Sequence, residues 1–135
     1  MKEYFVSTEA EMIQLGYEFI QKIGVPSIIA IVGELGAGKT HFTKGVAKFV
    51  GREDVTSPTF SLVNEVLGDE TSMYHFDFYR IKREEELLDL GWDEYLQQGG
   101  VIVAEWANLF PQLMPDSTHW IKIEHAKGGR TVTIA

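Results

Sequence analysis

Residues 33–40 read GELGAGKT and constrain the fold more than any other part of this sequence. Their spacing, a glycine, four residues, then glycine, lysine and threonine, is typical of a phosphate-binding loop, which joins a buried strand to the start of a helix. Both neighbours are present. Residues 28–32 are a short, β-branched apolar run, and residues 41–51 carry apolar side chains at helical spacing before they end in glycine. The loop therefore predicts an α/β domain.

The residue types of this loop define its chemistry. Glycine lets the backbone turn sharply, so that N–H groups face inward and form a nest for an anion at the N-terminus of the following helix. Lys39 would bridge the β- and γ-phosphates of a nucleotide, and the hydroxyl of Thr40 would bind a magnesium ion. Guanine-specific GTPases use an Asn-Lys-x-Asp element that this sequence lacks. ATP with Mg²⁺ is therefore the favoured ligand pair.

Periodic segments elsewhere predict one three-layer domain over residues 1–135. Thr8 and Glu11 fit a capping box at the start of a helix that stops at Gly24 and Pro26. The apolar stripe expected to face the core on that helix is Ile13, Tyr17, Ile20 and Ile23. Two short helices are expected at residues 83–91 and 92–97, strands at residues 4–6, 60–67, 72–79 and 100–106, and a hairpin at residues 119–134. We expect a P-loop NTPase-like α/β fold with a mixed sheet, parallel near the phosphate loop and antiparallel at one edge, in the C-terminal hairpin.

The chain is acidic, with a net charge of −8, and this charge limits its partners. A domain that gripped RNA or DNA by itself would be expected to carry a basic face. Acidity is concentrated in residues 82–95, a segment that is either a solvated helix face or a docking surface for a basic partner. Cysteine is absent, the first residues lack the apolar run of a signal peptide, and no apolar run is long enough to span a membrane. These features predict a cytoplasmic protein.

Two acidic residues follow apolar runs in the way that magnesium-binding acids do in phosphate-loop enzymes. Glu105 comes after the buried run VIVA, and Asp77 comes after MYHF, where strand alternation places His75 and Asp77 on one face and Phe76 on the other. We assign Glu105 to magnesium, and Asp77 to the water shell of the metal or to the attacking water. The alternative for each acid is a structural cap on a helix or turn.

Hydroxyl and guanidinium groups near these acids are further candidates. Ser57 and Thr59 lie in the segment TSPTF and could sense a γ-phosphate, as switch segments do, although the same segment could equally be a turn. Arg80 follows Asp77 by three residues and would either stabilise charge during the reaction or anchor the switch, with the anchor favoured.

Four motifs in this order, GELGAGKT, SPTF, YHFDFYR and VAEW, resemble the TsaE (YjeE) family over essentially the whole chain. This resemblance implies an ATPase subunit of bacterial tRNA threonylcarbamoyladenosine biosynthesis that acts through TsaB and TsaD partners and meets tRNA only indirectly. His41 stands where a small hydroxyl residue is expected after the loop.

The resemblance also assigns roles to individual residues. It implies that Thr40 and Glu105 bind Mg²⁺, that Lys39, Asp77, Glu105 and Thr59 form the catalytic set, and that Trp106 lies beside the nucleotide. The residues implied to bind ATP are Gly36, Ala37, Gly38, Lys39, Thr40 and His41, with Thr8 and Arg130 closing over the base and sugar.

Two other functions remain open at this stage. A small-molecule kinase could use the same loop, although no segment is long enough to form an acceptor pocket or a lid. A nucleotide-binding module without turnover could use the loop only to stabilise a shape that binds a partner.

Overall fold

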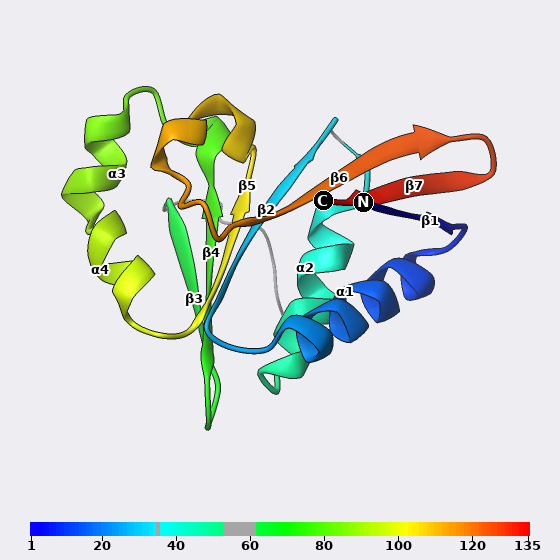
Figure 1. The fold of residues 1–135 in the computed structure, drawn as a ribbon, viewed down its shortest axis with the longest axis horizontal. Coiled ribbons are helices and arrows are strands. Elements are labelled where there is room, and N and C mark those ends of the chain that lie inside the picture. The colour runs from blue at the N-terminus through cyan, green and yellow to red at the C-terminus, as the bar shows by residue number, and fades with distance from the viewer. Residues whose placement is uncertain (35, 53–61) are drawn as a thin grey trace.

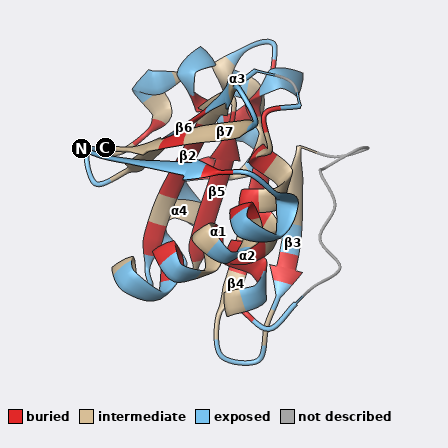
Figure 2. Ribbon diagram, turned by 90° about the vertical axis from the view of Figure 1, so that its right-hand side faces the viewer, coloured by how far each residue is buried: buried red, intermediate tan, exposed pale blue. Residues whose placement is uncertain are grey.

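A computed structural model describes residues 1–34, 36–52 and 62–135, which form three layers (Figure 1). A seven-stranded sheet lies between α1 and α2 on one face and α3 and α4 on the other (Figure 1). Figure 2 shows red, buried strands between helices whose outer surfaces are pale blue and exposed. Within the described residues, no helix combines the length and the apolar character that a membrane crossing requires. The three-layer α/β fold expected from the sequence is confirmed.

The sheet has the strand order β1-β7-β6-β2-β5-β4-β3. Its strands are β1 (Lys2–Val6), β2 (Ser27–Gly33), β3 (Val63–Leu67), β4 (Ser72–Asp77), β5 (Val101–Glu105), β6 (His119–Ala126) and β7 (Gly129–Ile134). The central strands β6, β2, β5 and β4 are parallel, as expected near the phosphate loop. Antiparallel pairing occurs at both edges, however, because β3 and β4 also form a hairpin. The expected antiparallel edge in the C-terminal hairpin is confirmed. The β3–β4 pair adds a second antiparallel edge, since the short connection between these strands can join only antiparallel neighbours.

Helix α1 (Glu9–Ile23) begins where the capping pattern places it. The hydroxyl of Thr8 accepts a hydrogen bond from the Glu11 amide at 3.1 Å, while the Glu11 carboxylate accepts one from the Ser7 hydroxyl at 2.7 Å. Glycine at position 24, with φ of 76°, ends the helix. The cap is therefore confirmed, with its second arm reaching Ser7.

The buried stripe of α1 differs from the expected one. Its buried residues are Met12, Gly16, Phe19 and Ile20, whereas Ile13, Tyr17 and Ile23 are only partly buried. The helix is rotated because its closest neighbour is a backbone. A methyl group added at Gly16 would lie 2.2 Å from the carbonyl oxygen of Phe42 in α2 (Lys39–Phe49). A glycine thus takes a core position that a count of apolar side chains does not find.

The opposite face of the sheet is covered by α3 (Glu84–Leu90), α4 (Trp92–Gln97) and three short 3-10 helices (Phe78–Arg80, Ala107–Leu109 and Pro111–Leu113). Trp92 is 1% exposed at the centre of this second core, and its indole N–H donates to the carbonyl of Leu113 at 2.9 Å. Most of the acidic side chains in residues 82–95 are exposed, as a solvated face would be.

Candidate functional site

A pocket of about 410 Å³ lies where β2 ends and α2 begins. Its walls come from the phosphate loop, the start of α1, the ends of β4 and β5, and the start of β7. The structure brings together in it the following residues that the sequence analysis named: Thr8, Gly36, Ala37, Gly38, Lys39, Thr40, His41, Asp77, Glu105, Trp106 and Arg130. Parallel strands and the helix after the loop therefore direct their ends toward one cavity, as in other α/β ligand sites.

The loop backbone adopts conformations that favour glycine. Gly36 and Gly38 have φ of 75° and 107°, both in the left-handed region, and Gly38 immediately precedes the first residue of α2. No side chain of a described residue caps the first turn of this helix. The first backbone N–H groups of a helix can donate hydrogen bonds to an anionic group, and the start of α2 lines the pocket.

Lys39 is buried and held by its own loop. Its ammonium group donates to the carbonyls of Gly33 at 2.7 Å and Glu34 at 2.8 Å, and lies 4.6 Å from the centre of the Trp106 ring. Burial lowers the pKa of Lys39, whereas the negative charges of Glu105 and Asp77 oppose that shift. A bound phosphate would replace the two carbonyls as the partner of this ammonium.

Asp77 and Glu105 are register partners at the ends of the adjacent parallel strands β4 and β5, so their side chains project from the same face of the sheet. The Asp77 carboxylate accepts a hydrogen bond from the Tyr79 amide at 3.1 Å and pairs with the Arg80 guanidinium at 3.6 Å. Burial raises the pKa of Asp77; the Tyr79 amide and Arg80 counteract this, and the charge of Glu105 adds to it. Asp77 therefore caps a 3-10 helix and also faces the pocket.

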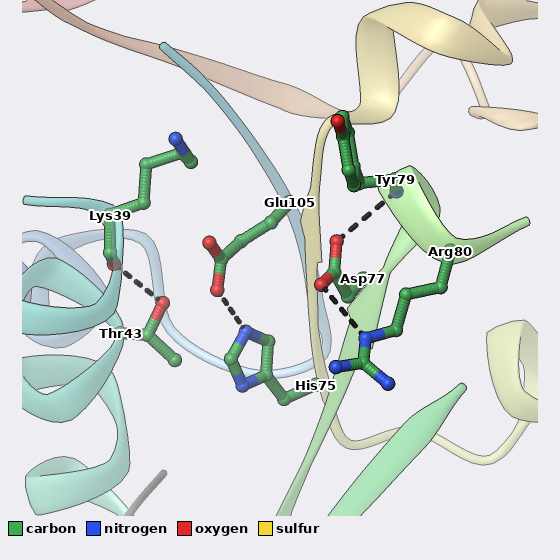
Figure 3. A network of polar contacts seen from close by, with 7 residues as sticks. All are labelled: Lys39, Thr43, His75, Asp77, Tyr79, Arg80 and Glu105. Carbon is green, nitrogen blue, oxygen red and sulfur yellow. Dashed lines mark hydrogen bonds and ion pairs between the residues drawn. The ribbon is translucent and has the colours of Figure 1, made fainter. Parts of the chain in front are cut away.

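Glu105 is 6% exposed and contacts a histidine that the sequence analysis did not include in the site. The Nε2 atom of His75 lies 2.5 Å from a carboxylate oxygen of Glu105, and the imidazole is fully buried (Figure 3). Strand alternation had already placed His75 on the same face as Asp77. That alternation was the available signal for this contact.

Trp106 follows Glu105 with φ of 60°, a left-handed conformation that is uncommon for a residue other than glycine. Its amide donates to the carbonyl of Ile31 at 3.1 Å, and its ring packs against Tyr79 with 5.0 Å between centroids and a tilt of 45° between the ring planes. The indole therefore contacts both the ammonium of Lys39 and the ring of Tyr79.

Arg130 lines the pocket and contacts the backbone of the phosphate loop. Its guanidinium donates to the carbonyls of Ala37 and Gly36, each at 3.1 Å. Across the pocket, His41 pairs with Glu9 at 3.3 Å. In this structure Arg130 holds the loop, whereas closure over a base and sugar remains a prediction.

Ser57 and Thr59 fall outside the described residues. Arg80 is not among the residues that line the pocket, but it forms an ion pair with Asp77, which does line it.

Comparisons with known proteins bear on the family of this chain. The family model described as threonylcarbamoyl adenosine biosynthesis protein TsaE matches residues 6–132. Two curated proteins named tRNA threonylcarbamoyladenosine biosynthesis protein TsaE are similar to it. The Bacillus subtilis (strain 168) protein is 42% identical over 100 residues, which are 73% of this chain and 62% of that protein. The Treponema pallidum protein is 38% identical over 111 residues, which are 81% of this chain and 82% of that protein.

A solved structure has the same arrangement of elements. The crystal structure of Bacillus subtilis YdiB superposes with a TM-score of 0.79 at 29% sequence identity, covering 98% of this chain and 83% of that one. The match to the curated Bacillus subtilis relative spans less than two-thirds of that protein's length.

Proposed function

The chain belongs to the TsaE family, and from this premise we propose that it is a Mg²⁺-dependent ATPase that serves threonylcarbamoyladenosine biosynthesis on tRNA. The observation that carries the proposal is the convergence of Lys39, Thr40, Asp77 and Glu105 on one pocket. We further propose that it works in the cytoplasm through TsaB and TsaD type partners. A net charge of −8 is compatible with action on a complex that holds the tRNA for it.

The donor set of the pocket fits a magnesium–phosphate ligand. Thr40, Asp77 and Glu105 present a hydroxyl and carboxylates, the hard oxygen donors that Mg²⁺ prefers. Within residues 1–34, 36–52 and 62–135, no group of three or more His, Cys, Asp or Glu side chains could hold a metal by itself. Mg²⁺ commonly shares its coordination between one or two protein ligands and substrate phosphates, and such a shared site is what we propose here.

Each pocket residue then has a role in converting ATP and water to ADP and phosphate. Lys39 would leave the loop carbonyls and neutralise charge on the β- and γ-phosphates. Thr40 and Glu105 would hold Mg²⁺, which when bound supplies charge neutralisation to the phosphate oxygens. Asp77 would orient the attacking water by accepting a hydrogen bond from it. The wall formed by Trp106 would limit the access of other water molecules to the pocket.

The test measures phosphate release by the full chain alone and with TsaB and TsaD type partners. Lys39→Ala and Glu105→Ala should each lower turnover by roughly a hundredfold, since each removes a charge aimed at the reacting phosphate. Lys48→Ala is the matched control, because Lys48 is an exposed lysine on the same helix, and turnover should be unchanged.

Three outcomes contradict parts of the proposal. Unchanged turnover in Glu105→Ala would remove the metal assignment. Phosphate transferred to an added metabolite in place of water would indicate a kinase. Nucleotide binding without turnover, even with both partners, would indicate a binding module. Trp106 reports binding independently, since of the three tryptophans it alone lines the pocket, whereas Trp92 and Trp120 pack in the core of the opposite layer.

A further inference from the structure

His75 is a buried titratable side chain to which the mechanism above gives no role. It lies on β4 two residues before Asp77, and Asp77 is the register partner of Glu105 on β5. This diagonal relation brings the imidazole Nε2 within 2.5 Å of a carboxylate oxygen of Glu105 (Figure 3). The exposed fraction of His75 is 0%, so its ring is shielded from water, whereas Glu105 also lines the pocket.

The second ring nitrogen determines which nitrogen carries the proton. Among the residues that the structure describes, none forms a hydrogen bond with the buried Nδ1 atom of His75. A proton on Nδ1 would therefore be a buried donor without an acceptor, which proteins rarely tolerate. The favoured tautomer carries its proton on Nε2, where it donates to Glu105.

Glu105 has a competing partner across the pocket. The positive charge of Lys39 attracts the carboxylate, as the electrostatic effect of Glu105 on the Lys39 ammonium indicates. If the Glu105 carboxylate formed an ion pair with Lys39, the ammonium would no longer be available to a phosphate. The carboxylate would no longer be available to a metal ion. In the structure the ammonium is held by loop carbonyls instead. Glu105 is held by His75 (Figure 3).

We propose that His75 is the positioning residue for Glu105: its Nε2–H holds one carboxylate oxygen and leaves the other available to a divalent cation in the pocket. This inference rests on the proposed function, in which Glu105 is a magnesium ligand. A partner that orients a metal ligand commonly contributes about 10–100-fold to metal affinity.

Two amide variants separate positioning from packing. In His75→Gln the side-chain amide nitrogen lies about as far along the side chain as Nε2, so it can still donate to Glu105. In His75→Asn the side-chain amide lies at the position of Nδ1, so this side chain is too short to donate to Glu105. His75→Leu removes the donor while keeping an apolar side chain of similar size. Thermal melts of all three establish that each variant is folded.

The first measurement is the affinity for a hydrolysis-resistant ATP analogue, followed by Trp106 fluorescence, in saturating MgCl₂ and in EDTA. The ratio of the two affinities is the factor by which the metal tightens binding. We expect His75→Asn and His75→Leu to lose about tenfold or more of this factor while affinity in EDTA is unchanged, and His75→Gln to retain most of it. An Asn variant equal to wild type, or a Gln variant no better than Asn, overturns the inference. A wild-type protein with no gain from MgCl₂ overturns the magnesium part of the proposed function instead.

The second measurement needs no nucleotide or metal. In ¹⁵N-histidine-labelled protein, NMR should show the His75 proton on Nε2 with a resonance that moves upfield in Glu105→Gln, where the acceptor is no longer charged. A proton on Nδ1, or a resonance that Glu105→Gln does not move, contradicts the proposed contact.

Discussion

Replacing Gly45 by alanine should destabilise the domain, because α1 and α2 touch there through their backbones. A methyl group at Gly45 would lie 2.0 Å from the carbonyl oxygen of Ile13 and 2.7 Å from the amide nitrogen of Tyr17. Neither atom belongs to a side chain that could rotate away. The two helices would have to separate by roughly 1 Å before normal van der Waals contact returned.

Two opposing effects set the magnitude. Alanine is favoured over glycine inside a helix by about 0.5–1 kcal/mol. Against this, an extra methyl group in a packed core costs about 1–3 kcal/mol, and the upper end applies because backbone atoms must move. Separation would also loosen the contacts of buried Phe19, Ile20, Phe42 and Val46. We expect a net loss of roughly 2 kcal/mol in the free energy of unfolding, or a fall in Tm of about 6–10 °C for a domain of this size.

Urea unfolding and thermal melts followed by circular dichroism measure this loss. Gln21→Ala, on the exposed surface of α1, is the control and should stay within about 0.5 kcal/mol of wild type. Gly16→Ala should resemble Gly45→Ala, and the double variant should lose less than the sum, since one separation of the helices relieves both clashes. Wild-type stability in Gly45→Ala would refute the backbone contact.

Three further changes test the pocket and its surroundings. Arg130→Ala should weaken nucleotide binding by roughly tenfold in fluorescence titrations, since about 1.4 kcal/mol of hydrogen bonding to the loop is lost. Arg130→Lys should recover little of this affinity, because lysine lacks the planar guanidinium that donates to both carbonyls. Hydrogen bonds from Ser7 lower the pKa of Glu11, so the ionised carboxylate stabilises the fold above pH 4.5 and this stability disappears as the pH falls through the lowered pKa. The difference in Tm between wild type and Glu11→Gln should therefore shrink below that pH. Burial raises the pKa of Asp77, so its ionised form is disfavoured in the fold; Asp77→Asn should raise Tm at pH 7 while it lowers ATP turnover.

The meeting of the GELGAGKT loop with Asp77 and Glu105 could be predicted because the signals are local. A strand, a glycine-rich turn and a helix are contiguous in the sequence, and an acid directly after an apolar strand lies at a strand end wherever that strand sits in the sheet. Lys39, Glu105 and Asp77 accordingly line one pocket in the structure.

The contacts that the sequence did not reveal depend on which strands and helices are neighbours. His75 meets Glu105 only because β4 and β5 are adjacent and in a particular register. Arg130 meets the phosphate loop because β7 lies next to β6, which lies next to β2. The rotation of α1 follows from Gly16, which packs against the backbone of α2 because it has no side chain. A pattern of apolar side chains cannot reveal such a position.

The pairing of β1 with β7 affects the order in which the chain can fold. The hydrogen bond from Arg130 to Ala37 joins residues 93 positions apart, whereas β2, the loop and α2 are contiguous. Contacts between distant residues form late, because closing a long loop costs entropy that local contacts do not. The phosphate nest can thus form early during synthesis, but the wall built by β7 and the start of α1 must await the last strand. Under the proposed function, nucleotide binding would therefore report that the whole sheet has assembled. A chain stopped before β7 would carry the loop motif without a complete pocket.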